Sequence, residues 1–363
     1  MTINRTALVL GATGGVGGEV ANLLLTRGWN VRALHRNPDT LPPGREMPGL
    51  HWLRGDAMSA TDVARAASGV SVIIHAVNPP GYRDWGTLVL PMLDNTIGAA
   101  QANGALIVLP GTVYNFGPDV LPDLREDSPQ NPVTAKGKIR TEMERRLRAA
   151  ASAGCKVLIV RAGDFFGPSA ANNWFSQALV KPHGPVSTIA YPGAPGIGHQ
   201  WAYLPDVAET IALLLERSAS LESFAVFHME GHWDADGTQI IEAIRRNAGN
   251  PRIKVRAMPW RLMRLLSPFV PLFRELAEMR YLWVTPVRMG NERLRAVLGA
   301  EPHTPLDEAV RKTLIGLRCL GDQQGPLVAP AVSKRACAKG RRQERVVVRR
   351  TCTSNQPGRE LSR

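Results

Sequence analysis

The sequence predicts an α/β protein built on a doubly wound parallel sheet, with a smaller lobe in the C-terminal half. Short apolar runs alternate with helical segments through roughly the first 160 residues, which is the pattern of successive βαβ units. A glycine-rich turn follows the first apolar run and opens a helix. Beyond these units the alternation gives way to stretches rich in proline and glycine, which predict long loops around a second lobe.

The glycine-rich turn lies between an expected strand at Ala7–Leu10 and an expected helix through Val20–Leu25. Glycines let backbone N–H groups approach a pyrophosphate, and the helix dipole favours its negative charge. The G-x-x-G-x-x-G spacing and the flanking strand and helix therefore predict a dinucleotide site in a Rossmann-type fold. The residues expected to hold the cofactor here are Gly11, Thr13, Gly14, Gly15, Val16 and Gly17.

The remaining elements follow from hydrophobic runs and their spacing. Strands are expected at residues 31–34, 51–53, 72–77, 105–109, 156–160 and 224–229, and helices at 88–102, 133–153, 206–216 and 238–247. The stretch 260–279 is unusually apolar, carries interspersed arginines and is interrupted by Pro268 and Pro271. It is interpreted as a lid over the substrate pocket or a dimer face, with a basic amphipathic helix on a membrane or a partner as the alternative.

The end of the second strand bears on the choice of cofactor. NAD-binding folds usually carry an acid there for the ribose 2′-hydroxyl, whereas this chain has His35-Arg36. A guanidinium can hold a 2′-phosphate through paired hydrogen bonds, so NADP(H) is favoured and NAD(H) stays an alternative, with Arg36 then a solvated loop charge. Asp56 could reach the adenine ring or could be a turn residue, and Ala76 is also expected at the cofactor.

These residues resemble the extended and atypical branches of the short-chain dehydrogenase/reductase superfamily, the NAD(P)-dependent epimerase/dehydratase group. The resemblance spans residues 6–316. It rests on the glycine motif, on Gly55-Asp56, on Val113-Tyr114, on Arg161 with Phe166-Gly-Pro168, and on the segment 201–208. It implies an NADP(H)-dependent oxidoreductase or epimerase that acts on a small hydroxyl or carbonyl substrate.

The catalytic segment departs from the pattern of that family. The family's chemistry uses a Tyr-x-x-x-Lys pair on the helix at 133–153, in which the lysine holds the nicotinamide ribose and the phenol exchanges a proton. Alignment of the lysine and its following glutamate places Lys138 and Glu142, which leaves Thr134 at the tyrosine position. Pro110 stands where the family has a serine or threonine. An aliphatic hydroxyl is a far poorer proton donor than a phenol.

Two interpretations of this departure remain open. In the first, the chain is an enzyme in which Tyr114 supplies the phenol, Thr112 the lost hydroxyl, and Lys136 or Lys138 the positive charge. Tyr114 could instead only pack beside the cofactor. In the second, the chain binds a dinucleotide without turnover and works as a redox sensor or a regulator.

Polar and aromatic residues in the loop-rich half could line a substrate pocket. Singly each could pack within a loop, but together they suit a small organic substrate with hydroxyl or carbonyl groups. The expected substrate residues are Asp164, Asn173, Trp174, Gln200 and Tyr203. The spacing of the histidines does not match a metal-ligand pattern, so no metal is expected.

Composition and charge restrict the partners. The chain has 363 residues, and its net charge of +13 is uneven because ten Lys/Arg and three Asp/Glu lie in residues 321–363. That segment is predicted to be a disordered basic tail, and the +6 left on residues 1–320 gives no reason to expect nucleic acid on the folded body. Residues 1–320 are expected to form one NAD(P)-binding domain, whose substrate lobe comes mainly from 165–200 and 225–316.

The sequence contains no run of 18 apolar residues, and its four cysteines lack disulfide or metal spacing. These features favour a cytoplasmic protein with reduced thiols and without a membrane partner. Besides a small-molecule substrate, a second copy in a homodimer is the other partner considered.

Overall fold

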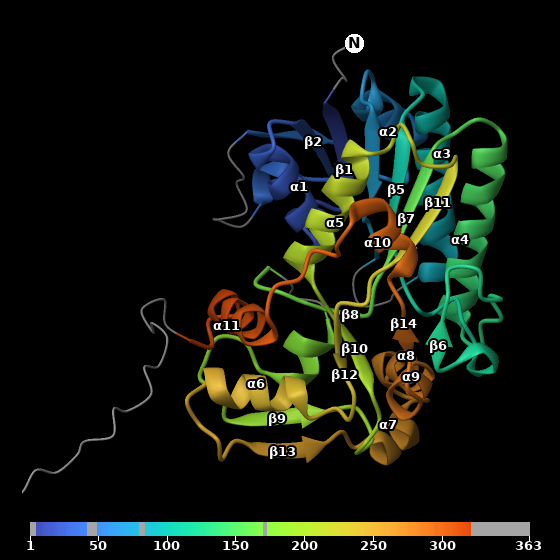
Figure 1. Cartoon of the computed structure of the whole chain (residues 1–363). Helices are drawn as coiled ribbons and strands as arrows, with labels where there is room; N and C mark the ends of the chain where they lie inside the picture. The colour runs from blue at the N-terminus through green and yellow to red at the C-terminus, as the bar shows by residue number, and fades with distance from the viewer. Residues whose placement is uncertain (1–4, 42–48, 80–83, 170–172, 321–363) are drawn as a thin grey trace, which may run out of the picture. The chain divides into compact units, whose positions relative to one another are not determined.

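A seven-stranded parallel sheet forms the centre of the computed structural model, which describes residues 5–41, 49–79, 84–169 and 173–320 (Figure 1). The strand order is β11-β7-β5-β4-β1-β2-β3, so the order reverses between β1 and β4. The strands are β1 (Thr6–Leu10), β2 (Asn30–His35), β3 (Leu50–Arg54), β4 (Val72–His75), β5 (Leu106–Gly111), β7 (Val157–Arg161) and β11 (Phe224–His228).

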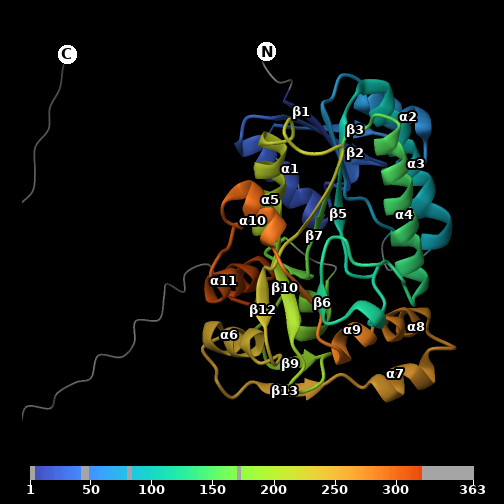
Figure 2. The ribbon, with the colours of Figure 1, turned by 45° about the vertical axis from the view of Figure 1, so that its right-hand side comes forward.

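Helices cover both faces of this sheet (Figure 2). Alternate side chains of β1 point to opposite faces, as a strand requires. Ala7 and Val9 pack with α1 (Gly15–Thr26) and α5 (Leu204–Glu216). Leu8 and Leu10 pack on the other face, with α2 (Ala60–Ala67), α3 (Trp85–Asn103) and α4 (Ala135–Ser152). The predicted doubly wound α/β fold is confirmed.

Each strand predicted in the first half is present, with ends that differ by no more than two residues. Helix α2 was not predicted, because it has eight residues and buries only Val63, Ala66 and Ala67. Two alanines and a valine give a weak apolar signal over so short a stretch. The capping residue is visible in the sequence, since Ser59 accepts a hydrogen bond from the Asp62 N–H.

The C-terminal lobe consists of small sheets and short helices. A three-stranded sheet, β12-β10-β8, is joined by the pairs β13-β9 and β14-β6. The strands are β6 (Asp123–Leu124), β8 (Asp164–Phe166), β9 (Thr188–Tyr191), β10 (His199–Tyr203), β12 (His232–Asp234), β13 (Lys254–Ala257) and β14 (Arg288–Met289). The helices are α6 (Gln239–Asn247), α7 (Trp260–Leu266), α8 (Pro271–Glu278), α9 (Tyr281–Val284), α10 (Glu292–Leu298) and α11 (Leu306–Gly316), with a π-helix at Phe175–Leu179.

Aromatic side chains form the core of this lobe. Trp201 and Trp283 are fully buried and lie 5.8 Å apart between ring centroids. The His199 ring stacks on Trp283 at 3.8 Å with nearly parallel planes. Large aromatic rings bury much apolar area per residue, so this small lobe reaches a dense core with short elements.

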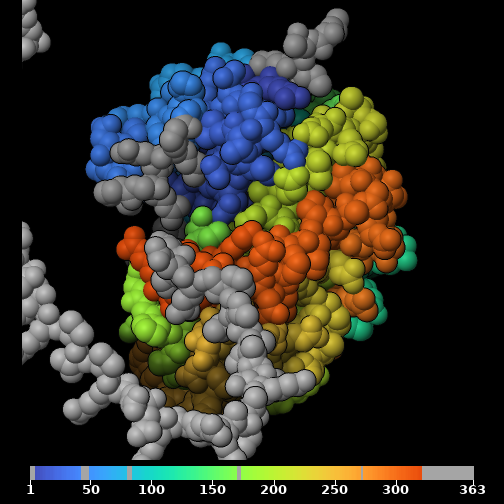
Figure 3. All heavy atoms as spheres, turned by 60° about the vertical axis from the view of Figure 1, so that its left-hand side comes forward, coloured from blue at the N-terminus to red at the C-terminus, as the bar shows by residue number. Residues whose placement is uncertain are grey.

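The last helices tie the lobe to the sheet domain. Leu294 of α10 is buried in the same core cluster as α1 and α5. Thr304, between α10 and α11, donates from its backbone N–H and its hydroxyl to the Asp206 carboxylate, at 2.8 and 2.7 Å. Figure 3 shows α10 and α11, in orange and red, running between the blue N-terminal residues and the gold residues of α6.

A buried ion pair joins the sheet to α4. Arg161, at the end of β7, is fully buried, and its Nη1 lies 2.9 Å from Glu144 Oε1. The same guanidinium donates to the Thr112 carbonyl at 2.7 Å and to His228 Nε2 at 3.1 Å. One charged group therefore connects α4 with the ends of β5, β7 and β11.

The chain divides into a unit of residues 1–323 and a second unit of residues 324–363. The predicted basic tail lies outside the described residues, so its disorder and the boundary at residue 320 stay predictions. None of the helices in the described ranges is both long and apolar enough to cross a membrane.

Loss of the Glu144 carboxylate should destabilise the fold strongly. Glu144→Gln leaves the Arg161 guanidinium buried without its counter-charge, for which we expect a loss of about 3–5 kcal/mol in the free energy of unfolding. Glu142→Gln, on the solvent-facing side of the same helix, is the matched control and should cost less than about 1 kcal/mol. Urea denaturation followed by circular dichroism measures both. Similar losses in the two variants would contradict this role of the buried pair.

Candidate functional site

The glycine turn has the geometry that its sequence predicts. Gly11 has φ +92°, and a Cβ there would lie 2.5 Å from the Ala76 carbonyl oxygen. A Cβ on Gly17 would overlap the Gly11 carbonyl oxygen. Gly14 caps α1, and its N–H donates to that same carbonyl at 2.9 Å. Only glycine fits Gly11 and Gly17, and the turn brings the start of α1 close to the end of β4.

A cavity of about 150 Å³ lies beside this turn, at the carboxyl ends of β1, β4 and β5. This is where the strand order reverses, the place where open α/β sheets bind their ligands. The cavity is lined by Val16, His75, Ala76, Val77, Asn78, Pro79, Trp85, Pro110, Thr112, Tyr114, Arg140 and Phe165. We call it the strand-end cavity.

Four residues predicted for the site meet in the strand-end cavity: Val16, Ala76, Thr112 and Tyr114. They come from the first turn of α1, the loop after β4 and the loop after β5. The Thr112 hydroxyl accepts a hydrogen bond from the Tyr114 N–H at 3.3 Å, which fixes the backbone on which both residues stand. Pro110, where the family has a hydroxyl residue, lines the same cavity.

The predicted catalytic residues Thr134 and Lys138 lie at the start of helix α4, where Thr134 is buried and Lys138 is exposed. The Thr134 hydroxyl caps the helix by accepting from the Gly137 N–H at 3.0 Å, and Thr134 is only 5% exposed. Lys138 lies on the exposed face of α4. The inner face instead carries Lys136, Arg140 and Glu144, which recur every four residues and are all buried. Neither Thr134 nor Lys138 lines the strand-end cavity, and their catalytic roles stay predictions.

Lys136 and Arg140 stand two residues after Thr134 and Lys138, and they have the same spacing of four residues. Arg140 Nη2 donates to Asn78 Oδ1 at 3.3 Å, and the guanidinium lies 5.3 Å from the centre of the Trp85 ring. Lys136 Nζ pairs with Glu275 Oε2 of α8 at 2.8 Å. Arg140 thus supplies the cation of the strand-end cavity, while Lys136 holds α8 against α4.

His75 lines the strand-end cavity, although the sequence did not predict it as a site residue. Its Nδ1 lies 2.8 Å from the Thr96 hydroxyl, and its buried Nε2 has no hydrogen-bond partner within the described part of the chain. Burial, and then the charge of Arg140, lower the pKa of His75 to about 3. The ring is therefore neutral at physiological pH. Its place at the end of a strand, one residue before Ala76, was the available sequence signal.

The predicted ribose and adenine residues lie at the ends of β2 and β3. Arg36 is exposed, and its side chain makes no ion pair or hydrogen bond with other described residues. His35 Nδ1 accepts from the Asn37 N–H at 3.2 Å. The Asp56 carboxylate accepts from the Met58 N–H at 3.0 Å, which is a turn role; contact with adenine stays a prediction.

The residues predicted for substrate binding mostly pack or cap. The Gln200 amide hydrogen-bonds to the backbone of Glu230 and Met289 and is buried. Trp174 and Tyr203 are buried in the aromatic core, where burial raises the pKa of the Tyr203 phenol. None of these three residues lines the strand-end cavity, and a substrate role for them stays a prediction.

Asp164 and Asn173 are the polar members of the same predicted set. The Asp164 carboxylate lies 2.8 Å from His199 Nε2. Asn173 Oδ1 accepts from the Ser176 N–H and hydroxyl at 2.8 and 2.9 Å, so it caps the π-helix. A substrate role for these two residues is still a prediction, since residues 170–172 beside them lie outside the described ranges.

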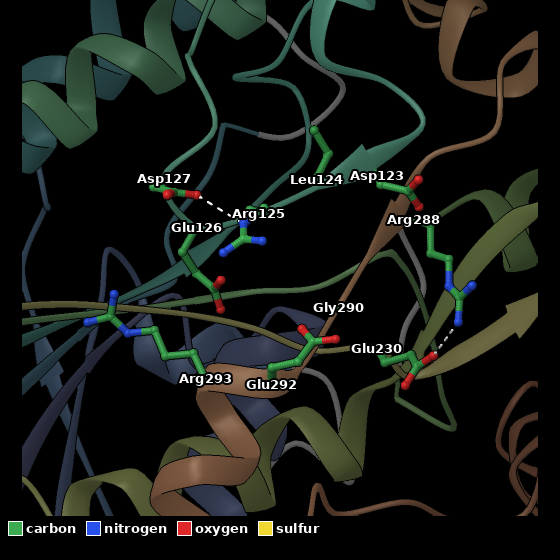
Figure 4. A pocket seen from close by; sticks show the side chains of 10 residues that line it. All are labelled: Asp123, Leu124, Arg125, Glu126, Asp127, Glu230, Arg288, Gly290, Glu292 and Arg293. Carbon is green, nitrogen blue, oxygen red and sulfur yellow. Dashed lines mark hydrogen bonds and ion pairs between the residues drawn. The ribbon is translucent and has the colours of Figure 1, made fainter.

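A second, larger cavity of about 640 Å³ lies between β6, β14 and the start of α10 (Figure 4). Five carboxylates and three guanidinium groups surround it, among them the ion pair Arg288–Glu230 at 3.1 Å. None of its lining residues comes from the glycine turn or from the ends of β1 and β4. The strand-end cavity is therefore the better candidate for the cofactor site.

Comparison with known proteins agrees with this fold and with a nucleotide-binding N-terminal segment. Residues 11–172 match the NAD(P)H-binding family. An uncharacterized protein, y4nL of Sinorhizobium fredii, is 28% identical over 47% of this chain and 53% of its own length. A 3-beta-hydroxysteroid dehydrogenase of Mycolicibacterium neoaurum is 40% identical over 19% of this chain and 18% of its own. The chain therefore spans about half of the first relative and about a fifth of the second.

Among solved structures, the UDP-glucose 4-epimerase of Thermus thermophilus in complex with NAD has the same fold. It superposes with a TM-score of 0.66 at 21% identity, over 86% of this chain and 99% of the epimerase. The resemblance predicted from the sequence is confirmed at the level of the fold and the NAD(P)-binding segment.

The buried neutral His75 predicts a pH dependence of stability. Its pKa of about 3 lies below the ordinary 6.5, so the unfolded chain binds one more proton between these values. The free energy of unfolding is therefore not lowered by this proton above about pH 6.5, and it falls toward pH 3 by about 1.4 kcal/mol per pH unit. His75→Gln should therefore lose stability less steeply between about pH 6 and pH 4. Denaturant titrations measure the slope, with the exposed His51→Gln as control; an unchanged slope in His75→Gln would refute the assignment.

Proposed function

We propose that this chain is an NAD(P)-dependent oxidoreductase or epimerase. Its residues 11–172 match the NAD(P)H-binding family, and its fold is similar to that of the epimerase/dehydratase group of short-chain dehydrogenases/reductases. The single observation that carries the proposal is the strand-end cavity, where the glycine turn meets a phenol and a buried cation.

The residues at this edge of the sheet fit a dinucleotide. The start of α1 offers backbone N–H groups and the positive end of its dipole to a pyrophosphate. Gly14 is exposed at that point, so no side chain stands between the ligand and the backbone. The orphaned Nε2 of His75 offers a polar contact within the cavity. A nicotinamide bound there would accept or donate a hydride.

Tyr114 and Arg140 are the residues we assign to proton transfer. Both line the strand-end cavity. A phenol can give a proton to a carbonyl oxygen or take one from an alcohol, and a nearby cation stabilises its phenolate form. Arg140 would take the role of the family's lysine, and a guanidinium keeps its charge at any physiological pH. Thr112 holds the Tyr114 backbone in place.

The substrate class follows from this chemistry. Hydride exchange at carbon coupled to proton exchange at oxygen requires an alcohol or a carbonyl group. Two similar proteins, a UDP-glucose epimerase and a hydroxysteroid dehydrogenase, are also named after compounds that carry hydroxyl groups. We therefore propose a small hydroxyl or carbonyl substrate for this chain.

One observation favours the alternative, a dinucleotide-binding regulator without turnover. The sequence alignment leaves Thr134 at the position of the family's tyrosine, and the ammonium group of Lys136, two residues further on, pairs with Glu275. A lysine in that pair cannot take over the role of the phenol. If Tyr114 does not replace it, the chain binds its cofactor and carries out no reaction.

Variants of Tyr114 and α4 separate these possibilities. With NADPH or NADH and a panel of carbonyl compounds, Tyr114→Phe should lower kcat about 100-fold or more, because a general acid contributes about 10²–10⁴. Calorimetry should show unchanged cofactor binding. Arg140→Met should impair both turnover and binding, whereas Lys138→Met should do neither.

If Lys138→Met impaired turnover and binding while Arg140→Met impaired neither, the sequence alignment that assigns the family's lysine to Lys138 would be supported. Absence of turnover by the wild type on the whole panel, with cofactor binding intact, would favour the regulator. Absence of binding to either nucleotide would overturn both.

We further propose that Arg36 selects NADP(H). Its exposed guanidinium lies at the end of β2 without a competing carboxylate partner among the described residues. Because charge-assisted hydrogen bonds contribute about 1.5–3 kcal/mol, Arg36→Leu should weaken NADPH binding about tenfold or more. NADH binding serves as the internal control and should change little. Equal losses for both nucleotides, measured by calorimetry, would argue that Arg36 does not read the 2′-phosphate.

A further inference from the structure

Exposed apolar side chains gather around α7. The described residues include seven large apolar side chains that are well exposed, and five of them come from residues 255–269. Their exposed fractions reach 72% for Leu265 and 82% for Phe269. Single exposed apolar residues are common on proteins, but a contiguous cluster marks an interaction site. The members are Val255, Leu262, Leu265, Leu266 and Phe269, and we call them the α7 surface.

The α7 surface has helical spacing. Leu262, Leu265, Leu266 and Phe269 stand at i, i+3, i+4 and i+7, which places them on one side of the helix and the turn after it. The opposite side packs inward, since Met263 is buried and the Trp260 indole donates to the Pro192 carbonyl at 2.9 Å. The helix is thus amphipathic, with its broader apolar side turned to solvent.

Cations surround this apolar cluster. Residues 252–274 contain six Lys/Arg and no acidic residue. Arg252, Lys254, Arg256, Arg261 and Arg264 are all exposed, and no carboxylate pairs with them within the described part of the protein. Figures 1 and 2 both show β13, which carries two of these cations, beside α7 at the end of the lobe away from the large sheet.

We propose that the α7 surface docks on an anionic lipid membrane. Exposed leucines and a phenylalanine enter the boundary between headgroups and acyl chains, while lysines and arginines around them meet anionic headgroups. This mode of binding requires no spanning segment. The sequence favoured a lid or a dimer face for this stretch and no membrane partner, with a membrane-bound helix as the alternative. The exposure of these leucines, which is a property of the tertiary structure, favours that alternative.

The charge pattern disfavours other occupants. A symmetric pairing of two copies would bring like charges together around the apolar centre. The chain's own segment 321–363 carries ten Lys/Arg against three Asp/Glu, so it has the same sign. Nucleic acid would satisfy the cations but would leave four leucine and phenylalanine side chains without an apolar partner.

The α7 surface directly precedes α8 in the chain. Only Val270 separates the turn at Phe269 from α8, whose Glu275 pairs with Lys136 on the inner face of α4. The docking proposal does not depend on catalysis, so its test can fail while the proposed function stands.

Vesicle co-sedimentation of the full chain tests the proposal. Vesicles of phosphatidylcholine with phosphatidylglycerol should bind the wild type, and vesicles of phosphatidylcholine alone should bind it far less. Leu265→Glu/Phe269→Glu should weaken binding at least about tenfold, because two buried apolar side chains are lost. Arg261→Gln and Arg264→Gln should each weaken it about fivefold.

The control is Met58→Glu/Val133→Glu, which introduces the same two negative charges at the two other exposed apolar residues. The affinity of this control for vesicles should differ by no more than about twofold from the affinity expected for the change in charge alone. Circular dichroism confirms that each variant is folded. Three results would overturn the proposal: no binding of the wild type to either vesicle, equal binding by the Leu265/Phe269 variant and the control, or a wild-type dimer in sedimentation equilibrium that the Leu265/Phe269 variant abolishes.

Discussion

The buried pair between Arg161 and Glu144 is the interaction on which the rest of the site depends. It fixes the rotation of α4, because Glu144 must face the end of β7 where the guanidinium lies. Side chains one and two turns earlier on the helix then face the same way, which brings Arg140 to the strand-end cavity and Lys136 to α8. Through the Thr112 carbonyl, the same guanidinium also positions the loop that carries Tyr114.

The chemistry of the site follows from this placement. A fold that elsewhere combines a phenol and a lysine on one helix here presents two cations on that helix, one in the cavity and one in an ion pair. The phenol stands on a different element, the loop after β5. In the proposed function, cofactor binding and proton transfer therefore involve three elements: the glycine turn, the β5 loop and α4.

In the C-terminal lobe, residue type alone does not tell a side chain that packs from one that binds a ligand. Gln200 and Tyr203 have the composition of a binding site, yet their partners are the backbone of β14 and the ring of Phe166. Conversely, the apolar stretch predicted as a lid or dimer face divides between two roles. Its second helix contacts α4 through Glu275, and its first helix exposes its apolar side.

The sequence by itself determined the doubly wound sheet, the glycine turn and the NAD(P)-binding class, because these depend on local spacing and hydrophobic period. It could not decide the register of α4. The spacing of a cation four residues before a glutamate occurs twice there, as Lys138–Glu142 and Arg140–Glu144, and only the distant Arg161 distinguishes the buried pair from the solvent-facing one. The burial of His75 in the cavity and the exposure of the α7 surface were likewise decided only by the tertiary structure, since both depend on contacts between residues far apart in the chain.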